Sequence, residues 1–362
     1  MVICLIGTRA QLIKMAPIMR ELETRRFKYK LVFTGQHKAT MAELLSEFKI
    51  AEAPEYIYRG EEITGIVQMG IWFLKVLARL GLRLKTYLPQ SPPSQSVILV
   101  HGDTFSTLLG AVAGKICGIR VAHVEAGLRS FKLWHPFPEE ITRLLVFRLC
   151  DIAFCPNAWA LQNLAAYRMR KIDSGGNTLI DAVNYAIAQP AHPLGQCKEA
   201  EYGVISLHRF ENIFDRSRFT RILSLIDLAA RRMPVVFVLH PATRKKLEQF
   251  ELLPRLLSND RYLLRDRMSY VPFLQLLSRS RFVITDGGSN QEELSYLGIP
   301  TLLMRQATER TEGIGRNVKI ANYDENKVLK FLDELDTTTK GLATVPSGAP
   351  SKIIIDHLEP YC

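Results

Sequence analysis

The chain has 362 residues, of which 47% are hydrophobic and 23% charged, and its formal net charge is +11. The length predicts two domains, and the composition excludes a disordered or fibrous protein. The positive charge is compatible either with an anionic ligand or with an ordinary surface rich in lysine and arginine. The sequence has no basic motif interleaved with aromatic residues, so binding to nucleic acid is not supported.

The amino-terminal residues "VICLIGTRA" predict a buried strand and a turn, not a signal peptide. No apolar run is long enough to span a bilayer, so stable membrane insertion is not expected. The six cysteines form no Cys-x-x-Cys pair and show no zinc-finger spacing. These features favour a reducing, cytoplasmic location.

Short apolar runs alternate with helical segments through the first half of the chain, which predicts a parallel sheet covered on both faces. Ligands of such sheets bind beyond the carboxyl ends of the strands. The strands are predicted in "VICLI", "KLVFTGQH", "SVILVHGDT", "RVAHVEAG", "DIAFCPN" and "RKIDSGGN". Their polar ends carry Thr8-Arg9, Gln36-His37, Gly102-Asp103 and Glu125.

The segment "IWFLKVLARLGLRLKTYL", which begins at Ile71, predicts an amphipathic helix. Lys75, Arg79 and Arg83 recur every four residues against an apolar remainder. The first interpretation is a helix that covers a sheet or a subunit interface and exposes its basic stripe to water. The alternative is a helix that lies on an anionic membrane.

The alternation restarts after the proline- and glycine-containing segment "AQPAHPLGQCKEAEYG". The second set of strands ends at His208, His240, Asp286 and Arg305. The sequence therefore predicts an α/β protein of two Rossmann-like domains that face a cleft. The predicted domains are residues 1–172 and 173–350, with a last helix, residues 351–362, that packs back on the first domain.

The motif "TDGGSNQEEL" places small residues between a strand and a helix in the second half. Backbone N–H groups of Gly287, Gly288 and Ser289 could hold a phosphate at the helix amino terminus, although a plain turn has the same pattern. Glu293, one turn into the helix, could accept hydrogen bonds from a ribose or be a solvated side chain. The chain lacks both G-x-G-x-x-G after its first strand and the P-loop motif, so a dinucleotide redox cofactor is unsupported.

Basic and acidic residues gather at the strand ends of the first half. Arg9 and Lys14 could meet a diphosphate or an acidic intermediate. Asp103, Glu125 and Glu139 could transfer protons if their surroundings separate their pKa values, although Asp103 could also be a helix cap.

Two histidines of the first half are candidate metal ligands together with the acids. His101 and His123 lie two residues from Asp103 and Glu125, but no third ligand has motif spacing, so a metal site is not expected. In the second half, His208 stands among polar neighbours, which favours a site over a buried core histidine.

The sequence resembles the UDP-N-acetylglucosamine 2-epimerase family over nearly its whole length. The motifs that carry the resemblance, in family order, are "GTRAQLIKMAPIMREL", "FTGQH", "VHGDTFSTLLGA", "HVEAGLRS", "PFPEEITR", "GGNTLIDA", "HRFEN", "TDGGSNQEEL", "YLGIPTLLMR" and "TERTEG". The resemblance implies a GT-B-type fold, a UDP-sugar substrate, no cofactor and a homodimer. It also implies elimination of UDP from UDP-GlcNAc to give a 2-acetamidoglucal, and re-addition of UDP to give UDP-ManNAc.

The resemblance also implies roles for the residues singled out above. Asp103, Glu125 and Glu139 would be acid/base groups on the two faces of the sugar, and Arg9, Lys14 and His208 would stabilise the departing diphosphate. Phe273 would lie against uracil, Gly287, Gly288 and Ser289 would hold phosphate, Glu293 would bind ribose, and Arg143 and Arg310 would bind further anionic groups.

The chain departs from the family pattern at several positions. Ala10-Gln11 replaces the usual Pro-Glu, and Gly287-Gly288-Ser289 replaces Ser-Gly-Gly. Phe210 replaces an arginine, and Lys38-Ala39 follow Gln36-His37 where a glutamine is usual. Because that arginine and glutamine help to bind an activating second UDP-GlcNAc in non-hydrolysing bacterial members, we expect this allosteric site to be lost.

The sequence is also compatible with four other functions. A hydrolysing epimerase would release ManNAc and UDP, and an epimerase of a modified UDP-HexNAc would keep the chemistry with another substrate. A glycosyltransferase of the same fold would need one base at most, so three strand-end acids argue against it. A UDP-sugar sensor would bind without turnover.

Overall fold

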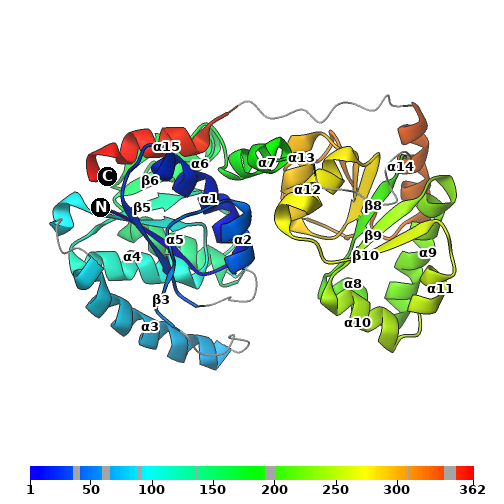
Figure 1. Ribbon diagram of the computed structural model, residues 1–362, viewed down its shortest axis with the longest axis horizontal. Helices are drawn as coiled ribbons and strands as arrows, with labels where there is room; N and C mark the ends of the chain where they lie inside the picture. Colours follow the sequence, from blue (N-terminus) through cyan, green and yellow to red (C-terminus); the bar gives the residue numbers. More distant parts are fainter. Residues whose placement is uncertain are drawn as a thin grey trace. The chain divides into compact units, whose positions relative to one another are not determined.

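The computed structural model describes residues 1–35, 41–58, 66–87, 92–134, 137–191, 201–308, 310–337 and 348–362. The chain divides into two compact units. Unit 1 comprises residues 1–182 and 348–362, and unit 2 comprises residues 183–347 (Figure 1). Each unit is a parallel sheet with helices packed on it, so the predicted α/β fold of two Rossmann-like units is confirmed.

The sheet of unit 1 has seven parallel strands in the order β3-β2-β1-β4-β5-β6-β7. The order reverses direction between β1 and β4, and a ligand crevice in such sheets opens at this point, beyond the strands' carboxyl ends. Both strands are buried along their whole length, as expected from their continuous apolar sequences. The strands are β1 (Val2–Ile6), β2 (Tyr29–Phe33), β3 (Glu55–Tyr56), β4 (Val97–His101), β5 (Arg120–Val124), β6 (Ile152–Cys155) and β7 (Arg170–Asp173).

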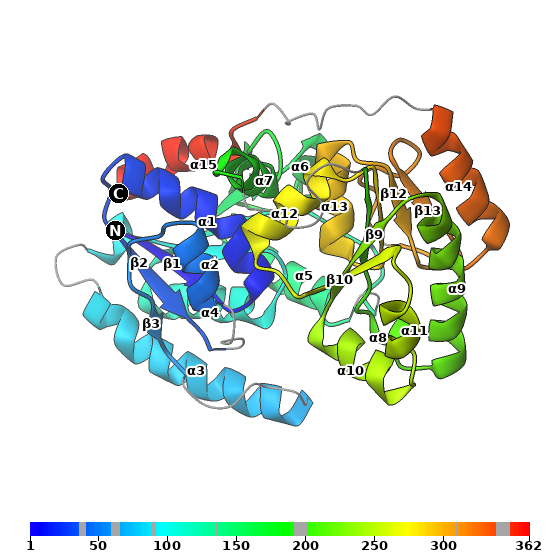
Figure 2. The ribbon, with the colours of Figure 1, turned by 45° about the vertical axis from the view of Figure 1, so that its right-hand side comes forward.

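The helices of unit 1 cover both faces of this sheet (Figure 2). They are α1 (Arg9–Thr24), α2 (Met41–Glu47), α3 (Ile66–Tyr87), α4 (Phe105–Cys117), α5 (Glu139–Leu149), α6 (Ala158–Asn163) and α15 (Pro350–Leu358). Helix α7 (Leu179–Ala188) begins in unit 1 and continues into unit 2, which starts at residue 183. Helix α15 packs on α1, where Arg25 and Asp356 form an ion pair of 2.6 Å. The 3-10 turns Pro93–Gln95 and Glu359–Tyr361 complete the unit.

The sheet of unit 2 has six parallel strands in the order β10-β9-β8-β11-β12-β13. Its order reverses between β8 and β11. The strands are β8 (Gly203–Ser206), β9 (Val235–Leu239), β10 (Tyr262–Asp266), β11 (Phe282–Thr285), β12 (Thr301–Leu303) and β13 (Val318–Ile320). The helices are α8 (Phe210–Ile213), α9 (Arg216–Arg232), α10 (Pro241–Gln249), α11 (Leu253–Leu257), α12 (Tyr270–Arg279), α13 (Gly288–Leu297) and α14 (Glu325–Thr337).

Among the described residues, no helix combines the length and the apolar character that crossing a bilayer requires.

Candidate functional site

The turn between β1 and α1 lies at the reversal point of the unit 1 sheet. A Cβ atom on Gly7 would lie 1.8 Å from Ser106 Oγ, so glycine lets this turn approach α4. Thr8 and Gln11 form a capping box, and Gln11 Nε2 donates to the carbonyl oxygen of His101 at 2.7 Å. Gln11 thus ties the end of β1 to the end of β4. Arg9 is the first residue of α1 and is partly buried.

Glu125 follows β5 directly and has a left-handed backbone, with φ of 61°. Its Oε1 accepts hydrogen bonds from Lys14 Nζ at 2.7 Å and from Asn177 Nδ2 at 2.6 Å. Its Oε2 lies 3.1 Å from His101 Nε2. Burial lowers the pKa of His101 to about 4, so this imidazole is neutral at pH 7. The positive charge in direct contact with Glu125 therefore comes from Lys14.

A second group of charges links the end of β4 to the start of α5. Asp103 accepts a hydrogen bond from Arg143 Nη2, and Arg143 Nη1 donates to Glu140 Oε2 at 3.2 Å. Glu140 is fully buried and also accepts from Arg129 Nε at 2.5 Å and from the Ser130 amide at 3.0 Å. Burial alone would raise the pKa of Glu140, but these donors together hold it below its ordinary value. Glu140 is therefore a fixed anion that orients two arginines.

Glu139 differs from its neighbour, although both stand in the first turn of α5. Its side chain is partly exposed, and its Oε2 atom is buried without a hydrogen-bond partner in the described part of the chain. A buried carboxylate oxygen that no protein donor satisfies is costly unless a ligand or water binds it. Glu139 thus has a carboxylate oxygen that can accept a hydrogen bond from a ligand.

The strand ends of unit 1 also bring together residues for which the sequence predicts no role in the site. From the sequence, His101 is a candidate metal ligand only, and Asn177, Arg129 and Glu140 have no predicted role. The signal for Asn177 was its place after the paired glycines that follow β7. Nothing in the sequence distinguished Glu140 from Glu139, because the two acids are adjacent.

The histidines do not form a metal centre. His123 Nε2 donates to the carbonyl oxygen of Gly102 at 2.7 Å, and burial lowers the pKa of His123 to about 4. The described residues include no cluster of three or more His, Cys, Asp or Glu side chains that could hold a metal ion.

In unit 2, Asp286 lies at the end of β11 and is fully buried. Its carboxylate accepts from the amides of His208 and Arg209, each at 3.0 Å, and from Asn212 Nδ2 at 2.9 Å. Asp286 therefore fixes the turn that follows β8. His208 Nδ1 lies 3.3 Å from Asp286 Oδ1, and 40% of the His208 side chain is exposed. The turn thus presents an oriented imidazole to solvent.

Helix α13 begins beside His208. Gly287 is the N-cap residue, and no side chain caps the helix. Gly288 and Ser289 form its first turn, and Ser289 is exposed. A Cβ atom on Gly287 would lie 3.0 Å from His208 Cε1, so the absence of a side chain brings the helix terminus close to the imidazole. Uncapped N–H groups and the helix dipole favour an anion at this position.

The remaining predicted residues of unit 2 lie on α12, on α13 and after β12. Glu293 is buried in α13, and Phe273 is partly buried in the first turn of α12. Arg310 pairs with the buried Glu292 at 2.5 Å. Gln291 Nε2 donates to the carbonyl oxygens of Arg310 and Glu312, which holds the described residues around Arg310 against α13.

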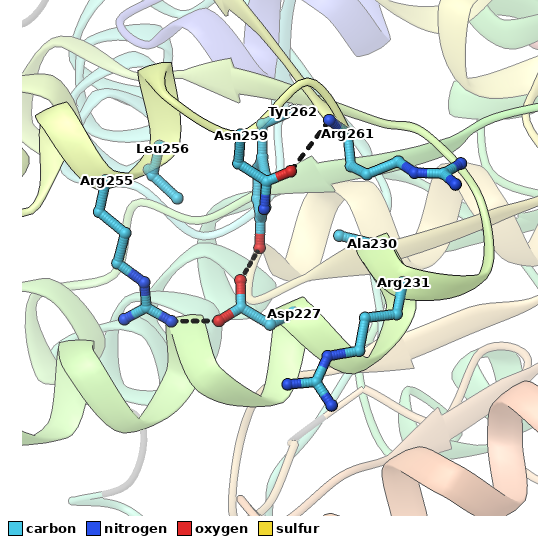
Figure 3. A pocket seen from close by; sticks show the side chains of 8 residues that line it. All are labelled: Asp227, Ala230, Arg231, Arg255, Leu256, Asn259, Arg261 and Tyr262. Atoms are coloured by element: carbon cyan, nitrogen blue, oxygen red, sulfur yellow. Dashed lines mark hydrogen bonds and ion pairs between the residues drawn. The ribbon is translucent and has the colours of Figure 1, made fainter.

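A separate cavity of about 400 Å³ lies at the amino end of β10, opposite to the strand ends described above (Figure 3). Its lining includes Arg231, Arg255 and Arg261. Arg255 and the Tyr262 hydroxyl both bind Asp227, and the guanidinium groups of Arg231 and Arg261 end apart from each other. This cavity is distinct from the strand-end residues.

The comparisons with known proteins agree on one family. The family model described as UDP-N-acetylglucosamine 2-epimerase matches residues 20–351. The chain is 30% identical over 344 residues to the UDP-N-acetylglucosamine 2-epimerase of Methanococcus maripaludis, covering 91% of this chain and 90% of that protein. It is 32% identical over 333 residues to the UDP-2,3-diacetamido-2,3-dideoxy-D-glucuronate 2-epimerase of Pseudomonas aeruginosa, covering 88% of each.

A solved structure with a similar fold is the UDP-GlcNAc 2-epimerase of Neisseria meningitidis bound to UDP-GlcNAc. The TM-score is 0.77 at 28% identity, and the match covers 99% of each chain.

Proposed function

The chain belongs to the UDP-N-acetylglucosamine 2-epimerase family, and from this premise we propose that it interconverts UDP-GlcNAc and UDP-ManNAc by inverting C2 of the sugar. The family match over residues 20–351 carries the proposal. The acids and bases at the strand ends of unit 1 and the uncapped helix α13 of unit 2 support it.

The reaction requires proton handling on both faces of C2. A carboxylate removes the C2 proton while the C1–O bond breaks, and the bonding electrons leave with UDP to give 2-acetamidoglucal. UDP then re-adds at C1, and an acid delivers a proton to the opposite face of C2. No net oxidation occurs, so the chemistry needs two positioned acid/base groups and stabilisation of the negative charge that builds up on the departing UDP.

We assign the acid/base work to Glu125 and Glu139, with Asp103 in support. Glu125 has two hydrogen-bonded donors on one oxygen, including Lys14, which is typical of a carboxylate held in one orientation. Glu139 keeps an oxygen that no described donor satisfies. Asp103 is oriented by Arg143. By family analogy, Arg143 would bind an anionic group of the substrate while it also contacts Asp103 and Glu140.

We assign the diphosphate to Arg9, Lys14, His208 and the first turn of α13. The exposed imidazole of His208 and the uncapped N–H groups after Gly287 offer donors to phosphate oxygens. By family analogy, Phe273 would contact uracil, Glu293 the ribose, and Arg310 a further anionic group.

Proton NMR of the purified protein with UDP-GlcNAc in D2O tests the proposal. UDP-ManNAc that carries deuterium at C2 is the expected product. Free ManNAc and UDP would instead assign a hydrolysing epimerase, in which water intercepts the intermediate. An unchanged sugar would contradict epimerisation of UDP-GlcNAc.

The similarity to the Pseudomonas aeruginosa enzyme, whose name specifies a modified UDP-sugar, gives a second candidate substrate. The same NMR assay with UDP-2,3-diacetamido-2,3-dideoxy-D-glucuronate decides between the two. The substrate with the larger kcat/KM is the one that this chain prefers.

We further propose that no second UDP-sugar activates the reaction. Phe210, at the position of the family's arginine, is 68% exposed and stacks on Phe214 with ring centroids 4.0 Å apart. Gln36, His37, Lys38 and Ala39 lie outside the described residues. Hyperbolic dependence of the rate on UDP-GlcNAc is expected, and a sigmoidal dependence would contradict it.

Substitution of Glu125 distinguishes the hypothesis of an enzyme from that of a UDP-sugar sensor without turnover. We expect Glu125→Gln to lower kcat about 10²- to 10⁴-fold, because the amide cannot accept the C2 proton, and to keep UDP-GlcNAc binding in calorimetry. Glu248→Gln, on the exposed side of α10, is the matched control. Unchanged turnover in Glu125→Gln would remove Glu125 from the mechanism.

A further inference from the structure

The cavity at the amino end of β10 is large enough to hold a small molecule. Its volume of about 400 Å³ lies within the range of small-molecule sites. The end of α9, the short helix α11 and the first residue of β10 line it (Figure 3). Ala230 and Leu256, both buried, supply apolar surface. The other lining side chains carry polar or charged groups, so a ligand would contact both kinds of surface.

The lining has three arginines and one acid. That acid, Asp227, is already engaged on both of its oxygens. Oδ2 pairs with Arg255, and Oδ1 accepts a hydrogen bond from Tyr262 Oη at 2.6 Å. The negative charge of Asp227 is therefore shared with Arg255, and the lining keeps an excess of positive charge.

The excess charge belongs to Arg231 and Arg261, neither of which forms an ion pair with a described residue. Arg231 lies in the last turn of α9, where a cation complements the helix dipole. Its neighbour Arg232 has the same position along the helix and in addition pairs with Asp333 at 2.5 Å. Arg231 lacks such a partner and lines the cavity instead.

The turn before β10 fixes the position of Arg261 and adds a donor. The Arg261 amide donates to Asn259 Oδ1 at 3.0 Å, which orients the Asn259 side chain. Asn259 Nδ2 makes no hydrogen bond within the described residues, so it can donate to a ligand. The cavity thus has two unpaired guanidinium groups and an amide donor on its lining.

We propose that this cavity binds a small metabolite that carries two separate phosphate groups. A guanidinium group matches the geometry of a phosphate and can bind it through two parallel hydrogen bonds. Because the guanidinium groups of Arg231 and Arg261 end apart from each other (Figure 3), one phosphate would bind at each. Asn259, Ala230 and Leu256 would contact the carbon skeleton between them.

This site is separate from the strand-end residues of unit 2. His208 and Asp286 follow the carboxyl ends of β8 and β11, whereas Arg261 precedes the amino end of β10. All strands of this sheet are parallel, so the two sets of residues lie at opposite ends of the sheet. The proposal therefore does not depend on the proposed reaction.

Isothermal titration calorimetry of the full chain at pH 7.5 tests the proposal, with fructose 1,6-bisphosphate as the probe. Saturating UDP is present throughout, so that a nucleotide site cannot take up the probe. We expect one bisphosphate to bind per chain and the affinity to fall with added salt. Fructose 6-phosphate, which has one phosphate, should bind more weakly, and fructose should not bind.

Three variants link the binding to the cavity. Arg231→Gln and Arg261→Gln should each raise Kd for the bisphosphate about tenfold, because each removes a charged hydrogen-bond donor. Both should fold, since these side chains are exposed. Asp227→Asn should lower Kd, because Arg255 loses its anionic partner and becomes available to phosphate. A purely structural role of these residues would not produce the opposite signs.

Unit 1 offers a matched control. Arg168→Gln combined with Arg170→Gln removes two exposed arginines at the amino end of β7. This variant should bind the bisphosphate with the Kd of the wild type. A loss equal to that of Arg231→Gln combined with Arg261→Gln would mean that the protein attracts anions through its net charge alone.

Three further results would overturn the proposal. They are the absence of binding heat with the bisphosphate, equal affinity for fructose 6-phosphate, and an unchanged Kd in Arg231→Gln and Arg261→Gln. Equal affinity for the monophosphate would show that the cavity does not recognise two phosphate groups.

Discussion

Glu139 and Glu140 are adjacent in the chain but have opposite surroundings. Glu140 is fully buried among two guanidinium groups and an amide, whereas Glu139 has a carboxylate oxygen without a described donor. The difference arises because successive helical residues point about 100° apart, so one faces the loop after β5 and the other does not. At the scale of single residues, the two acids therefore have separable roles.

This contrast predicts opposite effects of two conservative substitutions. Glu140→Gln should lower the free energy of unfolding by about 1–3 kcal/mol, because it replaces the buried anion that two partly buried guanidinium groups contact with a neutral amide. Glu139→Gln should leave stability nearly unchanged and lower kcat. Thermal unfolding and steady-state kinetics of the two variants check this. A stable Glu140→Gln protein, or an active Glu139→Gln protein, would contradict the respective role.

The two buried histidines of unit 1 predict a pH dependence of stability. Burial lowers the pKa of His101 and of His123 to about 4, against 6.5 in an unfolded chain. Below pH 6.5 the unfolded chain therefore binds protons that the folded chain does not. The free energy of unfolding should fall between pH 6.5 and pH 4, by about 3 kcal/mol for each histidine, and should not change through these groups above pH 6.5.

Calorimetry of the wild type and His101→Gln across this pH range checks the prediction. The glutamine is polar like the neutral imidazole but does not titrate, so the variant should lose less stability than the wild type on acidification. Because the carboxylates titrate in both proteins, equal losses would contradict the contribution of His101.

At the scale of elements, side-chain capping determines whether the amino terminus of a helix has N–H groups available to an anionic ligand. Helix α1 is capped by Thr8 and Gln11, so these side chains satisfy its first N–H groups. Helix α13 starts at a glycine without a side-chain cap. The two termini differ because a threonine and a glutamine three residues later can form a capping box, whereas glycine has no side chain to cap a helix.

The open terminus of α13 predicts that Gly287 cannot carry a side chain without cost to binding. The Cβ atom of Gly287→Ala would lie 3.0 Å from His208 Cε1, so the imidazole must move. We expect KM for the UDP-sugar to rise about tenfold, because a displacement of a few tenths of an ångström weakens an aligned donor. Gly81→Ala, whose Cβ atom would meet nothing within 4 Å, is the control and should leave the kinetics unchanged.

At the scale of the whole molecule, the chain returns to unit 1 after completing unit 2. Helix α15 buries Ile354, Ile355 and Leu358, and the Ser351 amide donates to Asp181 at 2.7 Å. These contacts join residues about 170 positions apart. Unit 1 therefore depends on the last residues of the chain for part of its core.

Deletion of residues 350–362 tests this dependence. We expect unit 1 to lose several kcal/mol of stability, because each fully buried aliphatic side chain contributes about 1.5–3 kcal/mol. Hydrogen exchange should then show less protection in α1, while β8 and β11 of unit 2 keep theirs. Equal loss in both units, or in neither, would contradict the assignment of α15 to the core of unit 1.

The α/β class, ten of the thirteen described strands and the positions of Glu125, His208 and Asp286 at strand ends follow from local apolar periodicity and turn residues, so the sequence predicts them. The sequence does not predict β3, β10 or β13, which are short or only partly buried. It also showed an amphipathic α3, since the spacing of Lys75, Arg79 and Arg83 is a local property.

Which groups contact one another follows only from the packing of the folded chain. Lys14 and Glu125 are 111 residues apart, and Asn177 reaches the same carboxylate from beyond β7. Burial likewise decided that His101 is neutral and that Glu140, not Glu139, is the structural anion. Side-chain burial and long-range pairing are set by the packing of the sheet and its helices, and no local pattern in the sequence encodes them.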